Sequence, residues 1–401
     1  MKIIDSITDK NEWLMYLQHK IDGENIRREE RKKLERYIKE EKYTYLKDKI
    51  TEGEFFSALP VKKMVNKEGS KKSRVVYSFE DEISIPLKFI AFKLHKYDNR
   101  LSDNCYSFRQ GYGVKNAINK IKRNNKIKSM FCYKIDISNY FNSIDPDTLL
   151  DRISFLKEED EEIYRLFRSM LLNNNVVVNG SIISENHGAM AGIPVSPFFA
   201  NFYLAESDRK FQDALYFRYS DDIIIFAESE EELDKYRKIL SEVIYESKLK
   251  FNYDKEIIAN PLDKWEFLGF SYDDGIIDIS ENTKRKIKSK IKRKADALRR
   301  WQRKKNLTED KAAIGFIRSM NYKFFGGGEE DEFTWSRWFF GNINTDKSLR
   351  EIDSYMQEYI RYIITGRHYK GNYRIKYETM KKWGYLSLVN EYYKRQKNSV
   401  F

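Results

Sequence analysis

The sequence predicts an α+β fold in which an antiparallel sheet is combined with helical segments. Two short runs rich in β-branched and aromatic residues, 130–137 and 217–226, are typical of strands. Polar residues at 220–222 interrupt the second run, as expected for a hairpin. Residues 8–50 and 284–305 instead place their apolar side chains at helical spacing. The chain has 401 residues, 41% of them hydrophobic, which allows more than one folding unit.

The predicted hairpin carries two adjacent acids, Asp221 and Asp222. Like charges side by side raise each other's pKa, and a cation is the simplest way to neutralise them. A solvated turn is the ordinary explanation for such a pair. A third acid, Asp136, favours a metal site because it ends the strand predicted at 130–137. Three carboxylates suit Mg2+, and two ions roughly 3.5–4 Å apart support phosphoryl transfer.

Three motifs, in this order, resemble the palm motifs of reverse transcriptases. They are Asp136 followed by Phe141, the run Gly192-Ile193-Pro194-Val195-Ser196-Pro197, and Tyr219-Ser220-Asp221-Asp222. With the flanking motifs, the resemblance extends from about residue 62 to residue 270. It implies a right-hand polymerase with fingers, palm and thumb, an antiparallel palm sheet, and helical segments at both ends of the chain. The implied activity is RNA-templated DNA synthesis.

The resemblance also implies a catalytic set. Asp136, Asp221, Asp222 and the backbone carbonyl of Ile137 would hold two Mg2+ ions, for which Mn2+ is a possible substitute. The run ending at Lys255 resembles the motif whose lysine approaches the leaving pyrophosphate. Lys255 would therefore act as a proton donor.

Nucleotide and primer contacts follow from the same resemblance. The implied nucleotide-binding residues are Lys67, Arg74, Arg109, Phe141, Gly192 and Tyr219. The Phe141 ring would lie beneath the sugar and clash with a 2′-hydroxyl. The alternatives are a solvated basic hairpin for Lys67 and Arg74 and a core aromatic for Phe141. The residues resembling a primer grip are Phe267, Leu268 and Gly269. One departure is Met190-Ala191 in place of the usual Pro-Gln, which removes an amide expected to contact the nucleotide or template.

The net charge of +12 and the 15% aromatic content favour a nucleic-acid partner, although Lys and Ile richness can also follow from genome base composition. Between 284 and 305, thirteen Lys or Arg residues accompany a single acid. We expect this helix to begin the thumb and to contact a nucleic-acid backbone through Lys288, Lys292 and Arg299. A solvated helix is the alternative. Trp335, Trp338 and Tyr385 are better suited to stacking on bases.

Other features exclude several classes. The two cysteines do not form a Cys-x-x-Cys pair and the four histidines are scattered, so we expect neither a zinc site nor a disulfide framework. No apolar run of about 18 residues occurs, and the N-terminus does not resemble a signal peptide. The sequence therefore predicts a cytoplasmic protein without a membrane partner.

The predicted domains are an N-terminal helical segment at 1–50, fingers at 51–130, a palm at 131–275, and a thumb with a C-terminal helical region at 276–401. No ribonuclease H, integrase or endonuclease motif accompanies them. This short set of domains resembles that of the stand-alone prokaryotic reverse transcriptases, namely those of retrons and of the unknown groups associated with phage defence. The run Ile363-Ile364-Thr365-Gly366 matches the retron thumb motif only in part, which favours the defence groups.

We therefore expect an RNA-directed DNA polymerase that copies a dedicated structured non-coding RNA in bacterial anti-phage defence. The implied partners are this RNA template, the DNA product and deoxynucleotides, and a homo-oligomer or a partner protein is compatible with the family. The alternatives are a retron reverse transcriptase and a catalytically idle RNA-binding scaffold with the same fold. An intron maturase is a weaker interpretation.

Overall fold

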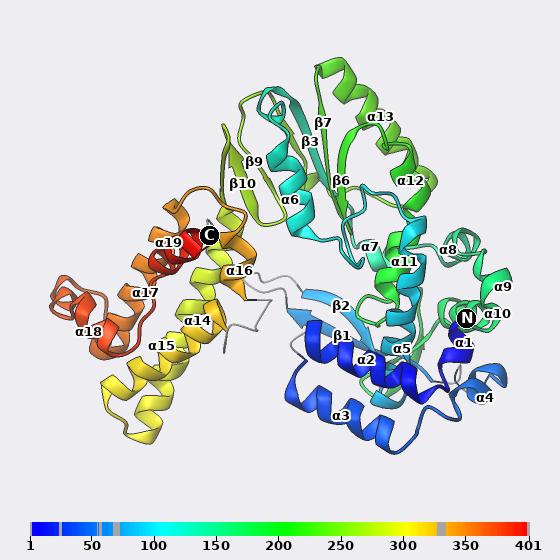
Figure 1. Cartoon of the computed structure of the whole chain (residues 1–401), viewed down its shortest axis with the longest axis horizontal. Coiled ribbons are helices and arrows are strands. Elements are labelled where there is room, and N and C mark those ends of the chain that lie inside the picture. The colour runs from blue at the N-terminus through cyan, green and yellow to red at the C-terminus, as the bar shows by residue number, and fades with distance from the viewer. Residues whose placement is uncertain are drawn as a thin grey trace. The chain divides into compact units, whose positions relative to one another are not determined.

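The computed structural model describes residues 2–23, 26–53, 55, 58–66, 73–326 and 334–398. The chain forms two compact units, a first unit of Met1–Leu262 and a second unit of Asp263–Phe401 (Figure 1).

Two helices of the first unit, α8 (Pro146–Arg152) and α13 (Glu230–Glu246), begin after a residue whose side chain caps them. α8 begins after Asp145, whose carboxylate accepts the Thr148 N–H at 3.0 Å. α10 (Glu161–Leu172) has acids in its first turn and buries the face containing Phe167. Further helices are α1 (Ile3–Ser6), α2 (Lys10–Gly23), α3 (Arg28–Lys39), α4 (Leu46–Thr51), α5 (Asp81–Leu94), α6 (Val114–Arg123), α7 (Tyr140–Ser143), α9 (Leu156–Glu159), α11 (Ser196–Tyr203) and α12 (Ala205–Arg209).

Four antiparallel strands form what we call the carboxylate sheet, in the order β6-β7-β3-β8. Its strands are β3 (Phe131–Asp136), β6 (Leu215–Tyr219), β7 (Asp222–Ala227) and β8 (Ile257–Ala259). The run Ile223, Ile224 and Ile225 is fully buried, which shows that both faces of β7 are covered. α13 contacts both β3 and β7 and lies beside them in Figure 1. The predicted strand at 130–137 and the predicted hairpin at 217–226 are both confirmed.

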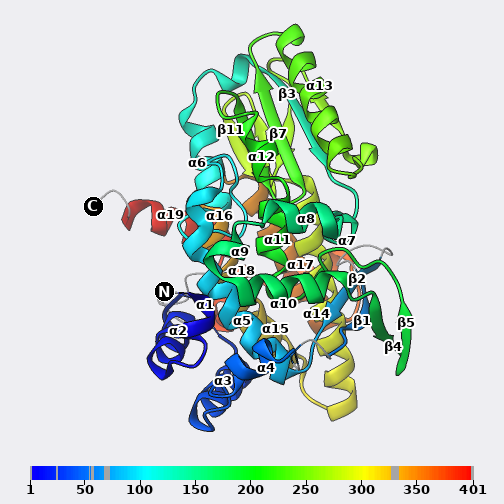
Figure 2. The same cartoon turned by 90° about the vertical axis from the view of Figure 1, so that its right-hand side faces the viewer.

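A second sheet of the first unit has the order β2-β1-β4-β5. Its strands are β1 (Val61–Asn66), β2 (Ser73–Ser78), β4 (Asn175–Val178) and β5 (Ser181–Ser184). β1 and β2 pair antiparallel, which confirms the basic hairpin expected in this region, and the β4–β5 hairpin extends the sheet (Figure 2). Lys67, expected to bind the triphosphate, lies outside the described residues.

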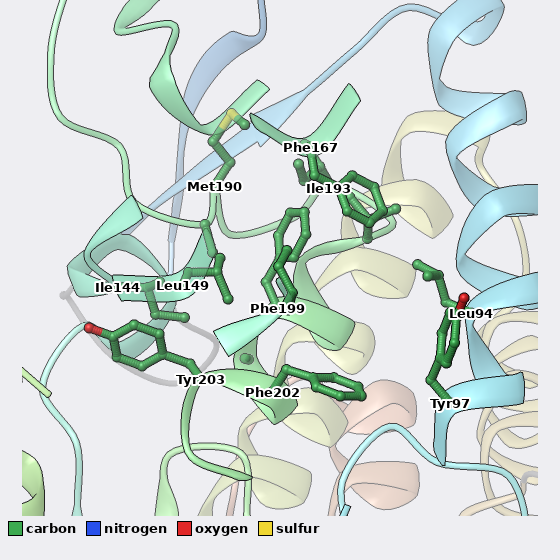
Figure 3. Close-up of a cluster of buried hydrophobic side chains, with 14 of the residues drawn as sticks. Leu94, Tyr97, Ile144, Leu149, Phe167, Met190, Ile193, Phe199, Phe202 and Tyr203 are labelled. Carbon is green, nitrogen blue, oxygen red and sulfur yellow. The ribbon is translucent and has the colours of Figure 1, made fainter. Parts of the chain in front are cut away.

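Aromatic side chains pack among the Ile and Leu residues of the core between these sheets and helices. Figure 3 shows Phe199 of α11 close to Phe167 of α10, with Phe202 and Tyr203 farther along α11. The Phe167 and Phe199 ring centroids are 4.8 Å apart in an edge-on arrangement. Aromatic pairs of this kind add specific geometry to the burial of apolar area. The core thereby fixes α11 and the loop before it, which contains the Gly192 motif.

The second unit combines a small sheet with a group of helices. The sheet has the order β11-β10-β9 and consists of β9 (Trp265–Phe267), β10 (Phe270–Asp273) and β11 (Ile276–Ile279). The helices are α14 (Glu281–Lys305), α15 (Glu309–Phe325), α16 (Trp335–Phe340), α17 (Lys347–Thr365), α18 (Tyr377–Lys382) and α19 (Leu388–Asn398). α14 buries Ile287, Ile291 and Ala295 and packs against α15 and α17.

These features confirm the predicted α+β class with antiparallel sheets. The division between the two compact units falls after Leu262, whereas the palm was expected to reach residue 275. The predicted domain boundaries remain predictions. The strands β9 and β10 belong to the second unit. Within the described part of the chain, no helix is both long and apolar enough to cross a bilayer.

Candidate active site

The structure brings the three predicted carboxylates to one end of the carboxylate sheet. Asp136 ends β3 and is the register partner of Asp222, the first residue of β7. Asp221 lies in the two-residue turn between β6 and β7, and its carbonyl accepts the Ile137 N–H at 2.9 Å. Two adjacent strands and one turn therefore position all three acids. The carbonyl of Ile137, the fourth predicted metal ligand, follows directly after Asp136.

The turn that carries Asp221 has an unusual backbone. Ser220, its first residue, has a φ of 60°, a value that non-glycine residues rarely adopt. The Ser220 N–H donates to the hydroxyl of Ser107 at 2.9 Å, and its carbonyl accepts a hydrogen bond from Arg218. These contacts fix the turn on both sides, which stabilises its left-handed residue.

Burial and mutual repulsion perturb the acids of the turn. Burial, together with the nearby Asp136, raises the pKa of Asp221 to about 6. Burial also raises the pKa of Asp222, while the neighbouring Lys134 opposes this shift. Carboxylates in such surroundings need cations when ionised, in agreement with the expectation from the adjacent acids of the sequence.

Two lysines provide positive charge at the site. Lys134 Nζ lies 2.9 Å from Asp222 Oδ1. Lys255 Nζ donates to Asp136 Oδ2 at 2.7 Å, and its side chain is 51% exposed. Lys255, predicted to act as a proton donor, is therefore at the carboxylates. Lys134 was not predicted, although a lysine in the middle of a buried strand was a visible signal.

The residues present fit a hard cation in their donor chemistry. Three carboxylates and the Ile137 carbonyl supply the oxygen ligands that Mg2+ prefers. The Ile137 carbonyl accepts no hydrogen bond from the described residues. With the lysines in place, however, no group of three or more acids, histidines or cysteines among the described residues is arranged as a preformed metal site. The fit is therefore one of ligand type and proximity.

Three aromatic rings gather beside the carboxylates. Phe108 lies with its ring centroid 6.2 Å from that of Phe141 and 6.0 Å from that of Tyr219. Phe108 has a φ of 53° and is partly exposed. Phe108, Gly192 and Tyr219 also line a cavity of about 590 Å³. The structure thus brings together three predicted nucleotide-binding residues and adds Phe108, for which the sequence predicted no role.

Position 192 requires glycine because of its backbone conformation. Its φ is 106°, and a Cβ atom there would lie 2.9 Å from the Tyr77 carbonyl oxygen of β2. The adjacent Ala191 carbonyl accepts the Tyr77 N–H at 2.8 Å, and the Ala191 N–H donates to the amide of Asn142. At the Met190-Ala191 departure, backbone contacts therefore tie the loop to β2 and α7, and Met190 is buried.

Arg74 and Arg109, two of the basic residues expected near the triphosphate, differ in exposure. Arg74 lies exposed on β2, opposite Val65. Arg109 lines the same cavity as Gly192 and Tyr219 but is only 8% exposed, and its nucleotide-binding role stays a prediction. Its Nη atoms donate to the carbonyls of Ser102, Cys105 and Asp98, so the guanidinium holds its own loop.

The predicted residues of the second unit also have defined surroundings. Leu268 and Gly269, with φ values of 51° and 89°, form the tight turn between β9 and β10, while Phe267 is buried. Lys288 pairs with Glu351 at 3.3 Å, and Arg299 donates to the Tyr362 carbonyl and lies over its ring. Lys292 is exposed. Among the three predicted backbone contacts, only Lys292 thus has no partner among the described residues.

Two aromatic predictions in this unit have different outcomes. Tyr385, expected to be suited to stacking on bases, is buried and donates to Asp353 at 2.7 Å, so its ring is not free to stack. Trp338 is 38% exposed.

A buried polar network behind the hairpin was not predicted. Arg218 and Asp208 form a fully buried ion pair, and Arg218 also donates to the Asn201 carbonyl. Asn201 exchanges hydrogen bonds with Ser107, which accepts the Ser220 N–H. An arginine inside the hydrophobic run of β6 was the available signal. The network as a whole could not be predicted, because Asn201 and Ser107 are 94 residues apart in the chain.

Comparisons with known proteins give one family and one structural likeness. The sequence profile described as reverse transcriptase (RNA-dependent DNA polymerase) matches residues 65–272, slightly more than half of the chain. No curated protein sequence matches. Similar solved structures include apo telomerase from Candida tropicalis truncated from its C-terminal domain, at 15% identity and a TM-score of 0.45, with 55% of each chain covered.

Telomerase from Candida albicans in complex with a fragment of telomeric RNA is 14% identical, with a TM-score of 0.45, 86% of this chain covered and 68% of that chain. This chain thus spans between half and about two thirds of these telomerase chains. The profile match covers β2, the three carboxylates, the Gly192 loop and the β9–β10 turn. The chain therefore belongs to the reverse transcriptase family.

Proposed function

We propose that this protein is an RNA-directed DNA polymerase that uses two divalent metal ions. The observation that carries the proposal is the gathering of Asp136, Asp221 and Asp222 at one end of the carboxylate sheet, in a chain of the reverse transcriptase family. Partial burial of these acids is unfavourable unless cations are present. Their ligand type points to Mg2+, with Mn2+ as a substitute.

Asp136, Asp221 and Asp222, with the Ile137 carbonyl, would hold the two ions. When bound, the ions supply activation of the attacking hydroxyl and stabilisation of the leaving oxygen. Lys255 contributes a proton. Its ammonium pairs with Asp136 at 2.7 Å, and its half-exposed side chain can turn toward a leaving pyrophosphate.

The aromatic group beside the carboxylates selects the sugar. Phe141 would lie beneath the sugar of the incoming nucleotide, and Phe108 lies between its neighbours Phe141 and Tyr219, with ring centroids 6.2 and 6.0 Å away. A 2′-hydroxyl would clash with the Phe141 ring, so deoxynucleotides are the preferred substrates. Arg74, exposed on β2, and Lys67 would bind the triphosphate as charged donors.

The template we propose is a dedicated structured non-coding RNA, copied in bacterial anti-phage defence. The support is the resemblance to stand-alone prokaryotic enzymes. In addition, Ile363-Ile364-Thr365-Gly366 matches the retron thumb motif only in part, which favours the defence groups. A retron enzyme is the alternative within the family. Sequencing of nucleic acid that co-purifies with the protein distinguishes them, because it identifies the template and shows whether the DNA product is joined to an RNA 2′-hydroxyl.

A second candidate is an idle RNA-binding scaffold. One observation favours it, since Lys134 and Lys255 already neutralise two of the acids. The test is extension of a DNA primer on an RNA template, with Mg2+, with Mn2+ and with a chelator. Synthesis that needs a divalent ion and is abolished in Asp136→Asn supports the polymerase. Absence of synthesis by well-folded wild type on homopolymer and co-purified templates supports the scaffold.

A further inference from the structure

A cavity of about 770 Å³ lies within the second unit, apart from the carboxylates. It is lined by α17, by Lys288 of α14 and by the segment that follows α17, including the short 3₁₀ helix Lys370–Arg374. Gly366 ends α17 in a left-handed conformation, with φ at 80°, and this turn leads the chain into the segment.

Tyrosines line this cavity. Tyr369 and Tyr373 are 46% and 67% exposed, which is unusual for two large rings at the same site. Arg361 lies over the Tyr373 ring at 5.0 Å, and Lys288 lies over the third tyrosine, Tyr355, at 5.6 Å. Exposed rings that already bind cations on one face present flat surfaces for stacking.

The charges of the lining are also uneven. Some polar groups of the lining have acidic partners: Lys288 pairs with Glu351, and His368 Nδ1 lies 2.7 Å from Glu358. The segment 367–376, however, contains four Lys or Arg residues in addition to His368, and no acid. Within it, Lys370 is exposed and forms no ion pair with the described residues. Unpaired positive charge is thus concentrated next to the exposed tyrosines.

One wall of the cavity contains an unsatisfied acceptor. Asn372 is 4% exposed, and its Nδ2 donates to the Arg367 carbonyl at 2.7 Å. Its Oδ1 is buried and has no hydrogen-bond partner among the described residues. Buried acceptors are nearly always paired, so this unpaired one marks a polar position in the cavity wall.

We propose that this cavity binds unpaired bases of a nucleic-acid strand. Bases would stack on Tyr369 and Tyr373, and Lys370 would contact a phosphate. The proposal rests on the polymerase function only for the source of the strand, which is either the RNA template or the DNA product. It differs from the cationic face of α14, which meets phosphates without reading bases.

The test measures binding of short oligonucleotides by fluorescence anisotropy. The probes are single-stranded oligo(rU) and oligo(rA) of about 12 nucleotides, oligo(dT) and oligo(dA) of the same length, and an RNA duplex. The variants are Tyr369→Ala, Tyr373→Ala and Lys370→Gln. Tyr322→Ala is the matched control, because Tyr322 is also 67% exposed in this unit but does not line the cavity.

Each cavity tyrosine variant should weaken single-strand binding about 5- to 150-fold and leave duplex binding unchanged. The salt dependence of single-strand binding should stay the same in the tyrosine variants, but its log-log slope should fall by about 0.7 in Lys370→Gln. A larger effect with RNA probes identifies the template as the ligand, and a larger effect with DNA probes identifies the product.

An equal weakening in Tyr322→Ala, or an equal weakening with duplex, would overturn the proposal and leave an acidic peptide as the occupant to test. Comparison of wild type with the Asp221→Ala/Asp222→Ala protein, in DNA synthesis and in single-strand binding, separates the polymerase proposal from the cavity proposal. If that protein and wild type both make no DNA but bind single strands through the tyrosines, the polymerase proposal fails and the cavity proposal stands.

Discussion

Arg218 and Asp208 form a buried, doubly hydrogen-bonded ion pair next to the catalytic turn, with Nε–Oδ1 and Nη2–Oδ2 distances of 2.7 and 2.5 Å. Both side chains are fully buried. Arg218 also donates to the carbonyl of Ser220, so the pair positions the turn that carries Asp221. A buried charge that loses its partner is strongly destabilising, whereas a solvated pair contributes little.

Asp208→Asn should therefore lower the free energy of unfolding by about 3–5 kcal/mol. The matched control is Glu161→Gln, which breaks the Arg165–Glu161 pair with both side chains 56% exposed and should cost under about 1 kcal/mol. Urea denaturation of both variants measures the difference. Similar costs for the two changes would show that the buried pair does not stabilise the fold.

The metal assignment predicts a separation of activity from folding. Asp221→Ala combined with Asp222→Ala should abolish nucleotide incorporation on an RNA template, while circular dichroism stays close to that of wild type, because the changes lie at a turn. Undiminished Mg2+-dependent synthesis by this double variant would contradict the assignment of Asp221 and Asp222 as metal ligands.

The raised pKa of Asp221 predicts a pH dependence of stability in the presence of a chelator. The pKa is about 6 in the folded protein against 3.8 for the ordinary group, so the folded state binds this proton more tightly. The resulting stability is full below about pH 4 and is lost as pH rises through about 6, by up to about 3 kcal/mol. The stability of wild type relative to Asp221→Asn, measured by urea denaturation, should therefore fall between about pH 4 and about pH 7. A difference between the two proteins that is independent of pH would contradict the shift.

Phe141→Val should admit ribonucleotides, because it removes the ring that clashes with a 2′-hydroxyl and leaves the carboxylates in place. The measurement is the ratio of kcat/KM for a deoxynucleotide and the matching ribonucleotide. Phe155→Val is the control, since Phe155 is also half-buried but packs against Phe202 and Tyr97. A wild type that uses both sugars equally would show that Phe141 is only a core residue.

The exposed cations of α14 should govern the salt dependence of nucleic-acid binding. Changing Arg285, Lys292 and Arg300 to Gln should reduce the log-log slope of affinity against salt by about 0.7–0.9 for each phosphate interaction that the changes remove. Changing Lys288 and Arg299, which have partners within the unit, should alter the slope less. Identical slopes in the two sets would mean that α14 does not contact the strand.

Local patterns were sufficient to predict the catalytic strands and the hairpin. The β-branched run of β7 and the acid pair before it fix a strand and a turn within ten residues, and Asp136 ends a similar run. The long helix α14 followed from its spacing in the same way.

Partners distant in the chain could not be predicted from such patterns. A run of cations in the sequence does not show which of them form ion pairs. Lys288, for example, pairs with an acid about sixty residues away in the chain. Arg109 differs, because the three backbone carbonyls that accept its hydrogen bonds lie close to it in the chain, but its motif gave no sign of these local contacts.

The two lysines at the carboxylates have a consequence for metal uptake. Because Lys255 donates to Asp136 and Lys134 lies against Asp222, an arriving ion competes with a tethered ammonium for two of the three carboxylates. Occupancy is then a competition, so the apparent affinity for Mg2+ is weaker than that of the bare acids. A tethered competitor also keeps the empty protein folded when ions are scarce, and it returns to its place once they leave. Replacing the half-exposed Lys255 by Met would tighten Mg2+ binding at the expense of stability in the absence of the ion.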